Sequence, residues 1–125
     1  MLKIFRGMKA DPSGLPLCGD TARSLGVRVP IDIATDADGL VHPGTGGMST
    51  APDDPLLLPP HRRPRSLLGT GPDPVFGLPV GDIGQALQTR QDTPRHAFVE
   101  PADSMELPFY VHALQATRPR WKKVA

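Results

Sequence analysis

A glycine-rich segment with neighbouring hydroxyl groups is the first place in the sequence that could bind a ligand. Residues 44–50 read GTGGMST. Thr45, Gly46 and Gly47 would bring the backbone close to a ligand and expose N–H groups to an anion. The hydroxyls of Ser49 and Thr50 could hydrogen-bond a ribose or an amide. The segment lacks the lysine of a phosphate-binding GxxxxGK(S/T) loop, and it is not a GxGxxG motif followed by a helix. A plain turn and a ligand-binding loop both remain open.

Two basic side chains could contact such a ligand. His96 follows a turn at the start of an expected strand, and an imidazole that titrates near neutrality suits ribose binding or proton transfer. Arg6 lies in an otherwise apolar strand, where a charge is costly unless it is paired or faces a cleft. Its planar guanidinium suits a phosphate or a carboxylate. The alternatives are a histidine at the surface or the core edge, and an arginine that reaches solvent from the sheet edge.

Carboxylates that could stabilise a developing positive charge are few. Glu100 and Glu106 are the only glutamates, so chemistry through an oxocarbenium-like centre would use one of them or an aspartate. Either could instead be a solvated charge, and Glu106 could interact with a helix dipole. The four histidines match no zinc-binding spacing, so we expect no metal site.

Two basic clusters could meet phosphates or an acidic partner protein. Residues 61–65 read HRRPR, and the C-terminal residues 118–125 read RPRWKKVA. Trp121, among the cations of the tail, could anchor at a partner's surface. The alternative for both clusters is a solvated loop and a solvated tail.

The composition indicates one domain, residues 1–125, with a small core. The chain has 38% hydrophobic residues, 13 glycines and 16 prolines, which favours irregular backbone. A net charge of +1 argues against broad binding to nucleic acid. The single Cys18 excludes an internal disulfide. No apolar run is long enough to span a membrane, and Arg6 and Lys9 interrupt the apolar region that a signal peptide would need.

Short elements in the first part of the chain must position these residues. Alternation predicts a strand over residues 2–6 and a second over the β-branched residues 27–33. A short helix is possible near residues 20–24. After a turn at Asp38–Gly39, residues 40–42 form a short strand, and the glycine-rich segment leads into another.

The middle of the chain divides into a proline-rich stretch and an expected helix. Residues 51–79 contain eight prolines and therefore cannot form long helices. Residues 81–92 have a helical pattern, with Asp82 as a cap and with Ile83 and Leu87 on one face.

The last third is expected to hold a strand and the final helix. Residues 96–100 form the strand. Asp103 or Ser104 would cap a helix carrying Leu107, Val111 and Leu114 on one face, with Pro108 in its first turn. The basic tail is expected to be frayed. This order of elements indicates an α+β fold with a small mixed or antiparallel sheet and few helices.

Several segments together resemble bacterial type VI secretion effector toxins whose fold is like that of ADP-ribosyltransferases. Residues 40–49, LVHPGTGGMS, are similar to that family's Tyr-x-Pro-x-Thr-Gly-Gly-Thr-Ser segment, with Met48 in place of a threonine. Residues 95–105, RHAFVEPADSM, are similar to its Thr-His-Tyr-x-x-x-Pro-Ala-x-x-Met segment, and residues 3–7, KIFRG, to its Leu-Tyr-Arg-Ala strand. The usual Glu-x-Glu pair is absent.

The resemblance implies an enzyme that uses NAD and is toxic in the bacterial cytoplasm. A cognate immunity protein or antitoxin would neutralise it. Ser49 and His96 match the family's functional serine and histidine. Arg6 would contact a phosphate of the dinucleotide, and Ser49 with the backbone of Gly46 and Gly47 would shape the nicotinamide–ribose pocket. His96 would hydrogen-bond the ribose or a leaving group. Glu100 or an aspartate would assist cleavage of the glycosidic bond. The missing signal peptide is compatible with contact-dependent export and with a cytoplasmic toxin–antitoxin pair.

Two other functions remain open. The same residues could deplete NAD by transferring ADP-ribose to water or phosphate. Alternatively, the chain could be a non-enzymatic interaction module that binds through its proline-rich loop and basic tail.

Overall fold

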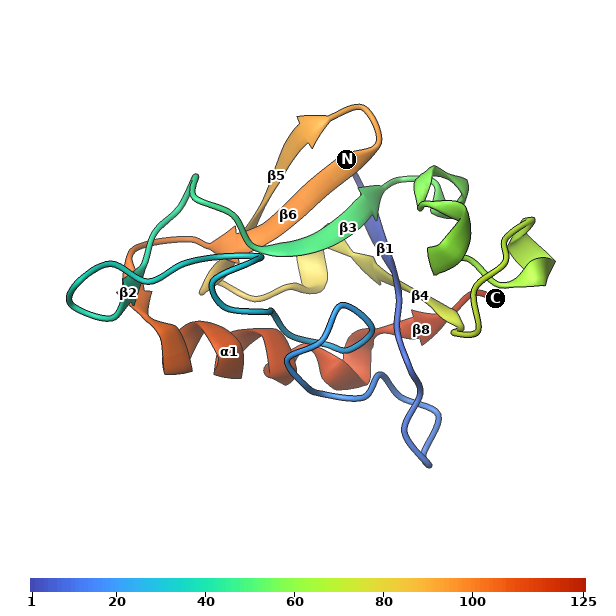
Figure 1. Ribbon diagram of the computed structural model, residues 1–125, viewed down its shortest axis with the longest axis horizontal. Helices are drawn as coiled ribbons and strands as arrows, with labels where there is room; N and C mark the ends of the chain where they lie inside the picture. Colours follow the sequence, from blue (N-terminus) through green and yellow to red (C-terminus); the bar gives the residue numbers. More distant parts are fainter.

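A six-stranded antiparallel sheet and a single α-helix make up the fold, which confirms the expected α+β class (Figure 1). The computed structural model describes residues 1–125. The strand order is β5-β6-β3-β1-β4-β8, and every ladder is antiparallel. The strands are β1 (Lys3–Gly7), β3 (Met48–Pro52), β4 (Val75–Pro79), β5 (Leu87–Thr93), β6 (His96–Pro101) and β8 (Lys122–Lys123). A separate two-stranded sheet pairs β2 (Leu40–Val41) with β7 (Met105–Glu106).

The large sheet consists of two halves that meet over a short contact. β5, β6 and β3 form one half, and β1, β4 and β8 form the other. β1 and β3 pair only through Ile4 with Pro52 and Phe5 with Ala51. Beyond Phe5, β1 continues along β4 but no longer pairs with β3. The two halves therefore diverge at Arg6.

The main core lies between the sheet and helix α1 (Leu107–Ala116), which runs along one side of it (Figure 1). Tyr110 links the two layers. Its hydroxyl donates to the carbonyl of Val99 at 2.5 Å and accepts from the N–H of Met48 at 3.1 Å. Other core side chains come from both layers and from the loops: Ile4, Met8, Leu25, Ile33, Val41, Phe76, Leu78, Leu114 and Trp121. The helix is thus fixed to β3 and β6 by hydrogen bonds as well as by apolar packing.

Five elements agree with the sequence predictions. β1, β2 and β6 match the expected strands to within one residue at each end, and β3 is the strand expected after the glycine-rich segment. α1 is the expected final helix with Pro108 in its first turn. The proline-rich stretch holds only the 3-10 segments η1 (Pro55–Leu57), η2 (Pro60–Arg62) and η3 (Arg65–Leu67) before β4 begins. Proline spacing therefore excluded long helices correctly.

The strand predicted over residues 27–33 is wrong. This segment turns instead: the N–H of Asp32 donates to the carbonyl of Arg28 at 2.7 Å, and the N–H of Arg28 donates to the Asp32 carboxylate at 2.7 Å. Residues 20–24 form a turn closed by Ser24, not a helix. Side-chain hydrogen bonds of aspartate and serine to the backbone compete with regular structure in both places.

The helix predicted over residues 81–92 is also wrong. Val80–Asp82 form the 3-10 segment η4, Gly84 has a φ of +88°, and β5 begins at Leu87. Ile83 and Leu87 are both buried, as their spacing suggested, but they reach the core from a turn and a strand. Pairing of β5 with β6 outweighs the local helical preference, because contacts with a neighbouring strand routinely override intrinsic propensity.

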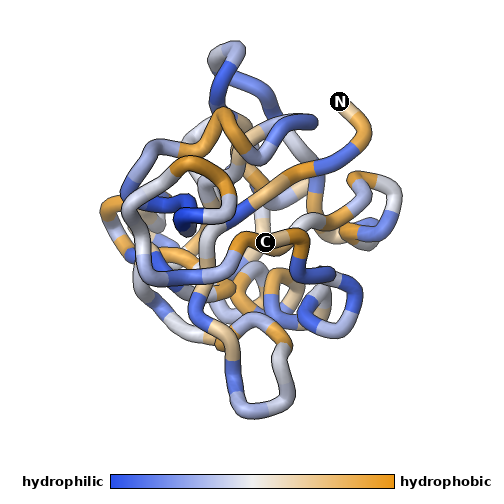
Figure 2. The backbone as a smooth tube through the Cα atoms, turned by 90° about the vertical axis from the view of Figure 1, so that its right-hand side faces the viewer, coloured by the Kyte–Doolittle hydropathy of each residue, from blue (hydrophilic) through white to orange (hydrophobic).

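The C-terminal tail is ordered rather than frayed. After η5 (Arg118–Arg120), the Trp121 side chain is 2% exposed, and its Nε1 donates to the Thr117 hydroxyl at 2.8 Å. β8 then pairs with β4. Trp121 therefore cannot anchor the chain at a partner's surface as predicted. Figure 2 shows that both chain ends carry apolar residues, whereas hydrophilic stretches lie in outer loops.

The start of α1 has no side-chain cap. Glu106 occupies the N-cap position, so neither Asp103 nor Ser104 caps the helix. The Ser104 hydroxyl instead lies 2.6 Å from Nδ1 of His42, whose Nε2 lies 2.7 Å from Asp36. This cluster joins the loops on either side of the β2–β7 pair.

Candidate functional site

A pocket of about 230 Å³ opens where β1 and β3 diverge. Its walls come from β1, β3, the loop between β1 and β2, the η1–η2 segment and the β5–β6 hairpin. Three residues selected from the sequence, Arg6, Ser49 and His96, line this one pocket. They come from three different strands and are brought together only by the sheet.

Arg6 is a buried cation that makes hydrogen bonds only to neutral groups. Its Nε and one terminal nitrogen donate to the carbonyl of Ser24 at 3.0 and 2.9 Å, and the other terminal nitrogen donates to the carbonyl of Ser49 at 2.8 Å. Burial lowers the pKa of Arg6 to about 10, with Asp32 opposing the shift and neighbouring arginines adding to it. The guanidinium remains charged at neutral pH, and no carboxylate pairs with it.

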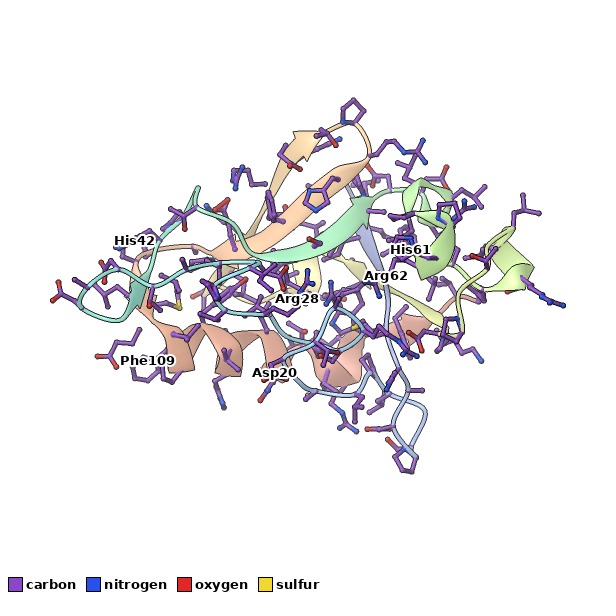
Figure 3. All side chains as sticks on the ribbon, viewed as in Figure 1. Asp20, Arg28, His42, His61, Arg62 and Phe109 are labelled. Atoms are coloured by element: carbon purple, nitrogen blue, oxygen red, sulfur yellow. The ribbon has the colours of Figure 1, made fainter.

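The pocket carries an excess of positive charge. Arg28 pairs with Asp32 at 2.9 Å, and Asp32 is the only carboxylate in the lining. Arg62 and Arg95 also line the pocket and form no ion pair. Figure 3 labels Arg28 and Arg62, two of the lining arginines, in the region around β1. A site with three unpaired guanidinium groups, one of them desolvated, favours an anionic ligand.

His96 is held at the pocket by a carboxylate across the β5–β6 hairpin. Its Nδ1 lies 2.6 Å from Oδ1 of Asp92, and its ring meets the ring of Phe98 edge-on with centroids 4.5 Å apart. Burial raises the pKa of Asp92, but the hydrogen bond and charge of His96, together with backbone hydrogen bonds at Asp92 and Thr93, outweigh burial and lower that pKa. Nε2 of His96 has no hydrogen-bond partner within the protein.

Ser49 presents a hydroxyl without a protein partner. It pairs with Phe98 across the β3–β6 ladder, so it lies on the same sheet face as His96, two residues from Phe98. The Thr50 hydroxyl donates to the carbonyl of Ala97 at 2.9 Å. Thr50 therefore does not replace the hydroxyl that is missing at Met48, which is buried in the core.

Thr45, Gly46 and Gly47 lie outside the pocket lining. The Thr45 hydroxyl donates to the carbonyl of His42 at 2.7 Å. Gly46 has a φ of +134°, and a Cβ on this residue would lie 2.2 Å from the carbonyl oxygen of Asp32. The N–H of Gly47 donates to the same oxygen at 2.9 Å. These glycines dock the backbone at Asp32 against β3, and so position the one carboxylate of the lining.

Glu100 is not brought to the pocket. Its side chain is fully buried, accepts from Nε of Arg90 at 2.9 Å and also accepts from the N–H of Gly44. The structure therefore gives the Glu100 carboxylate a role in fixing the glycine-rich loop to β5 and β6. The carboxylates near the pocket are Asp32 and, behind His96, Asp92.

Sequence reasoning missed three site residues, Arg28, Asp32 and Asp92. Arg28 and Asp32 are four residues apart, as are Asp92 and His96. That spacing of opposite charges was a usable signal, but it fell in segments that were interpreted as a strand and a helix. In the structure both pairs form across turns.

No protein-family model, curated protein or solved structure matches this chain. No group of three or more histidine, cysteine, aspartate or glutamate side chains is arranged to hold a metal ion. None of the helices combines the length and the apolar character needed to cross a bilayer.

Proposed function

We propose that the pocket binds the pyrophosphate region of NAD and that the protein is an ADP-ribosyltransferase-like toxin acting in the bacterial cytoplasm. The observation that carries this proposal is the buried, unpaired charge of Arg6 in one pocket with Ser49 and His96. These are the residues that the resemblance selects. The antiparallel sheet, divided at the pocket, supports an ADP-ribosyltransferase-like fold.

The charge of the pocket fits a dinucleotide better than its size does. A guanidinium that has only carbonyl acceptors gains a charge-assisted partner when a phosphate oxygen approaches. The volume of about 230 Å³ lies below the roughly 300–1,000 Å³ of most small-molecule sites. The pocket would therefore take one part of NAD, with the remainder outside it.

Cleavage of the bond between nicotinamide and ribose places positive charge on the sugar. A carboxylate or another fixed dipole must stabilise that charge. Asp32 is the carboxylate of the lining, so we propose it for this role in place of Glu100. Ser49 and His96 would hydrogen-bond the ribose or the acceptor. The product is an ADP-ribosylated target or, if water or phosphate is the acceptor, depleted NAD.

The proposed partner is a cognate immunity protein or antitoxin that covers the pocket. Unpaired Arg62 and Arg95 would favour an acidic surface on that protein. The alternative of a binding module loses the support of Trp121, which is part of the core. Deleting residues 118–125 would remove this core side chain and β8, so loss of function in that variant would report misfolding.

Growth after induced expression in the bacterial cytosol tests the proposal. The wild-type protein is compared with Ser49→Ala and His96→Ala at equal protein levels. Ser66→Ala and His112→Ala are matched controls, because both residues are exposed and lie outside the pocket. We expect the wild type and both controls to arrest growth and the two pocket variants not to do so. A fall in cellular NAD would favour depletion over transfer to a macromolecule. A harmless, folded wild-type protein would contradict the proposal.

A further inference from the structure

The contacts of the His96 ring determine which of its nitrogens faces the pocket. Asp92 occupies Nδ1, and the edge-on contact with Phe98 constrains the plane of the ring. Arg90 in turn lies over the face of Phe98, with its guanidinium carbon 4.8 Å from the ring centroid. The ring of His96 is therefore held on two sides, and Nε2 is the nitrogen left for a ligand.

Asp92, the partner of Nδ1, also determines which ring nitrogen of His96 carries the proton. An ionised carboxylate only accepts hydrogen bonds, so Nδ1 of the neutral imidazole must donate to Asp92. Nε2 then carries a lone pair and acts as an acceptor. Burial raises the pKa of Asp92, but the net effect of its hydrogen bonds and charged surroundings is a pKa below the usual value, so the carboxylate is ionised at neutral pH.

We propose that Asp92 is a positioning residue that holds His96 as a base, with Nε2 ready to take the proton of a hydroxyl group. The reaction part of this inference rests on the proposed function. The acceptor oxygen bonds to the ribose carbon, the glycosidic bond breaks, and its electron pair leaves with nicotinamide. The acceptor's proton moves to Nε2, and the resulting imidazolium is stabilised by Asp92.

The charge of the lining restricts the acceptor further. Arg6, Arg62 and Arg95 would repel the ammonium or guanidinium group of a lysine or arginine acceptor. A neutral O–H group meets no such repulsion and can donate to Nε2. The acceptor class is therefore a hydroxyl, carried by a macromolecule or by water.

The tautomer of His96 can be measured without any activity. Long-range proton–nitrogen NMR at a pH of about 8, where an ordinary histidine is neutral, distinguishes the two ring forms. His96→Gln assigns the signal among the four histidines. We expect Nδ1–H in the wild type and loss of that preference in Asp92→Asn, whose amide can donate to Nδ1. An Nε2–H form in the wild type would overturn the assignment.

Measurements of NAD turnover test whether Asp92 contributes to catalysis through His96. Asp92→Asn should reduce NAD turnover by about 10² or more, in line with the usual contribution of general base catalysis, and leave NAD affinity within about twofold. Asp92→Glu should restore part of the activity. Asp38→Asn is the control, because its exposed carboxylate accepts no hydrogen bond. Full turnover by Asp92→Asn would refute the positioning role.

The products identify the acceptor. Mass spectrometry of treated cell extract should find ADP-ribose free or attached to oxygen, whereas modification of arginine or lysine nitrogen would refute a hydroxyl acceptor. If the wild type does not consume NAD, the proposed function fails, and the NMR measurement still decides whether Asp92 sets the tautomer.

Discussion

The guanidinium of Arg6 donates to the backbone carbonyl of Ser49 at 2.8 Å, next to the point where β1 and β3 stop pairing. If the ladder continued, hydrogen bonds between backbone groups would join the two strands at this point. Here a side chain bridges them, and the space beside it becomes the pocket. The same residue thus closes the gap in the sheet and supplies the positive charge of the site.

This dual role predicts that Arg6→Lys loses stability as well as ligand binding. An ammonium group cannot reproduce the planar fork that reaches Ser24 and Ser49. We expect the free energy of unfolding to fall by about 1–3 kcal/mol, since a buried carbonyl loses its donor. Urea denaturation measures the change. Unaltered stability would show that the bridge is dispensable.

Gly7 is expected to tolerate no side chain. A Cβ there would lie 2.4 Å from the carbonyl oxygen of Arg62 and would push η2, one wall of the pocket, away from β1. Gly7→Ala should cost about 1–3 kcal/mol, as other overpacked sites do, and should weaken NAD binding. Gly81→Ala is the matched control, because nothing lies within 4 Å of its Cβ position. Equal behaviour of the two variants would contradict the packing argument.

The hydroxyl of Tyr110 should make the protein sensitive to alkaline pH. Burial raises the pKa of Tyr110 above its usual value, against smaller opposing effects of Met48 and Arg6. Because the folded-state pKa is the higher one, this contribution to stability is complete below about pH 10 and declines as the pH rises further.

The tyrosinate absorbance band follows this group directly, because the chain has one tyrosine. Ionisation should occur at higher pH in the native protein than in the urea-unfolded chain. Tyr110→Phe should remove the transition and cost about 1–3 kcal/mol, since the N–H of Met48 loses its acceptor. Coincident titration curves would refute the buried environment.

The Glu100→Gln substitution tests whether Glu100 has a structural or a catalytic role. The substitution leaves Arg90 without its ionic partner and weakens the contact to Gly44. We expect a stability loss of about 1–3 kcal/mol, moderated because Arg90 is partly exposed. At a temperature where the variant stays folded, NAD turnover should be close to that of the wild type. A folded variant without turnover would restore Glu100 to the catalytic machinery.

The sequence alone predicted five of the local elements and three of the residues that line the pocket. The strands at residues 2–6 and 96–100 show alternation, and α1 shows helical apolar spacing. Both patterns depend only on neighbouring residues, so they can be recognised in the sequence without knowledge of the fold. Arg6, Ser49 and His96 were selected because of their chemistry and their place in short segments.

Only the tertiary structure decided how these residues work together. Residues 81–92 became a turn and a strand because β6 provided a pairing partner, and Trp121 became part of the core because β8 pairs with β4. Docking of the Asp32 backbone against Gly47 placed Asp32 in the pocket, contacts with Arg90 and Gly44 kept Glu100 out of it, and the β5–β6 hairpin set Asp92 against His96. Strand register and loop docking depend on residues far apart in the chain, and local periodicity carries no information about them.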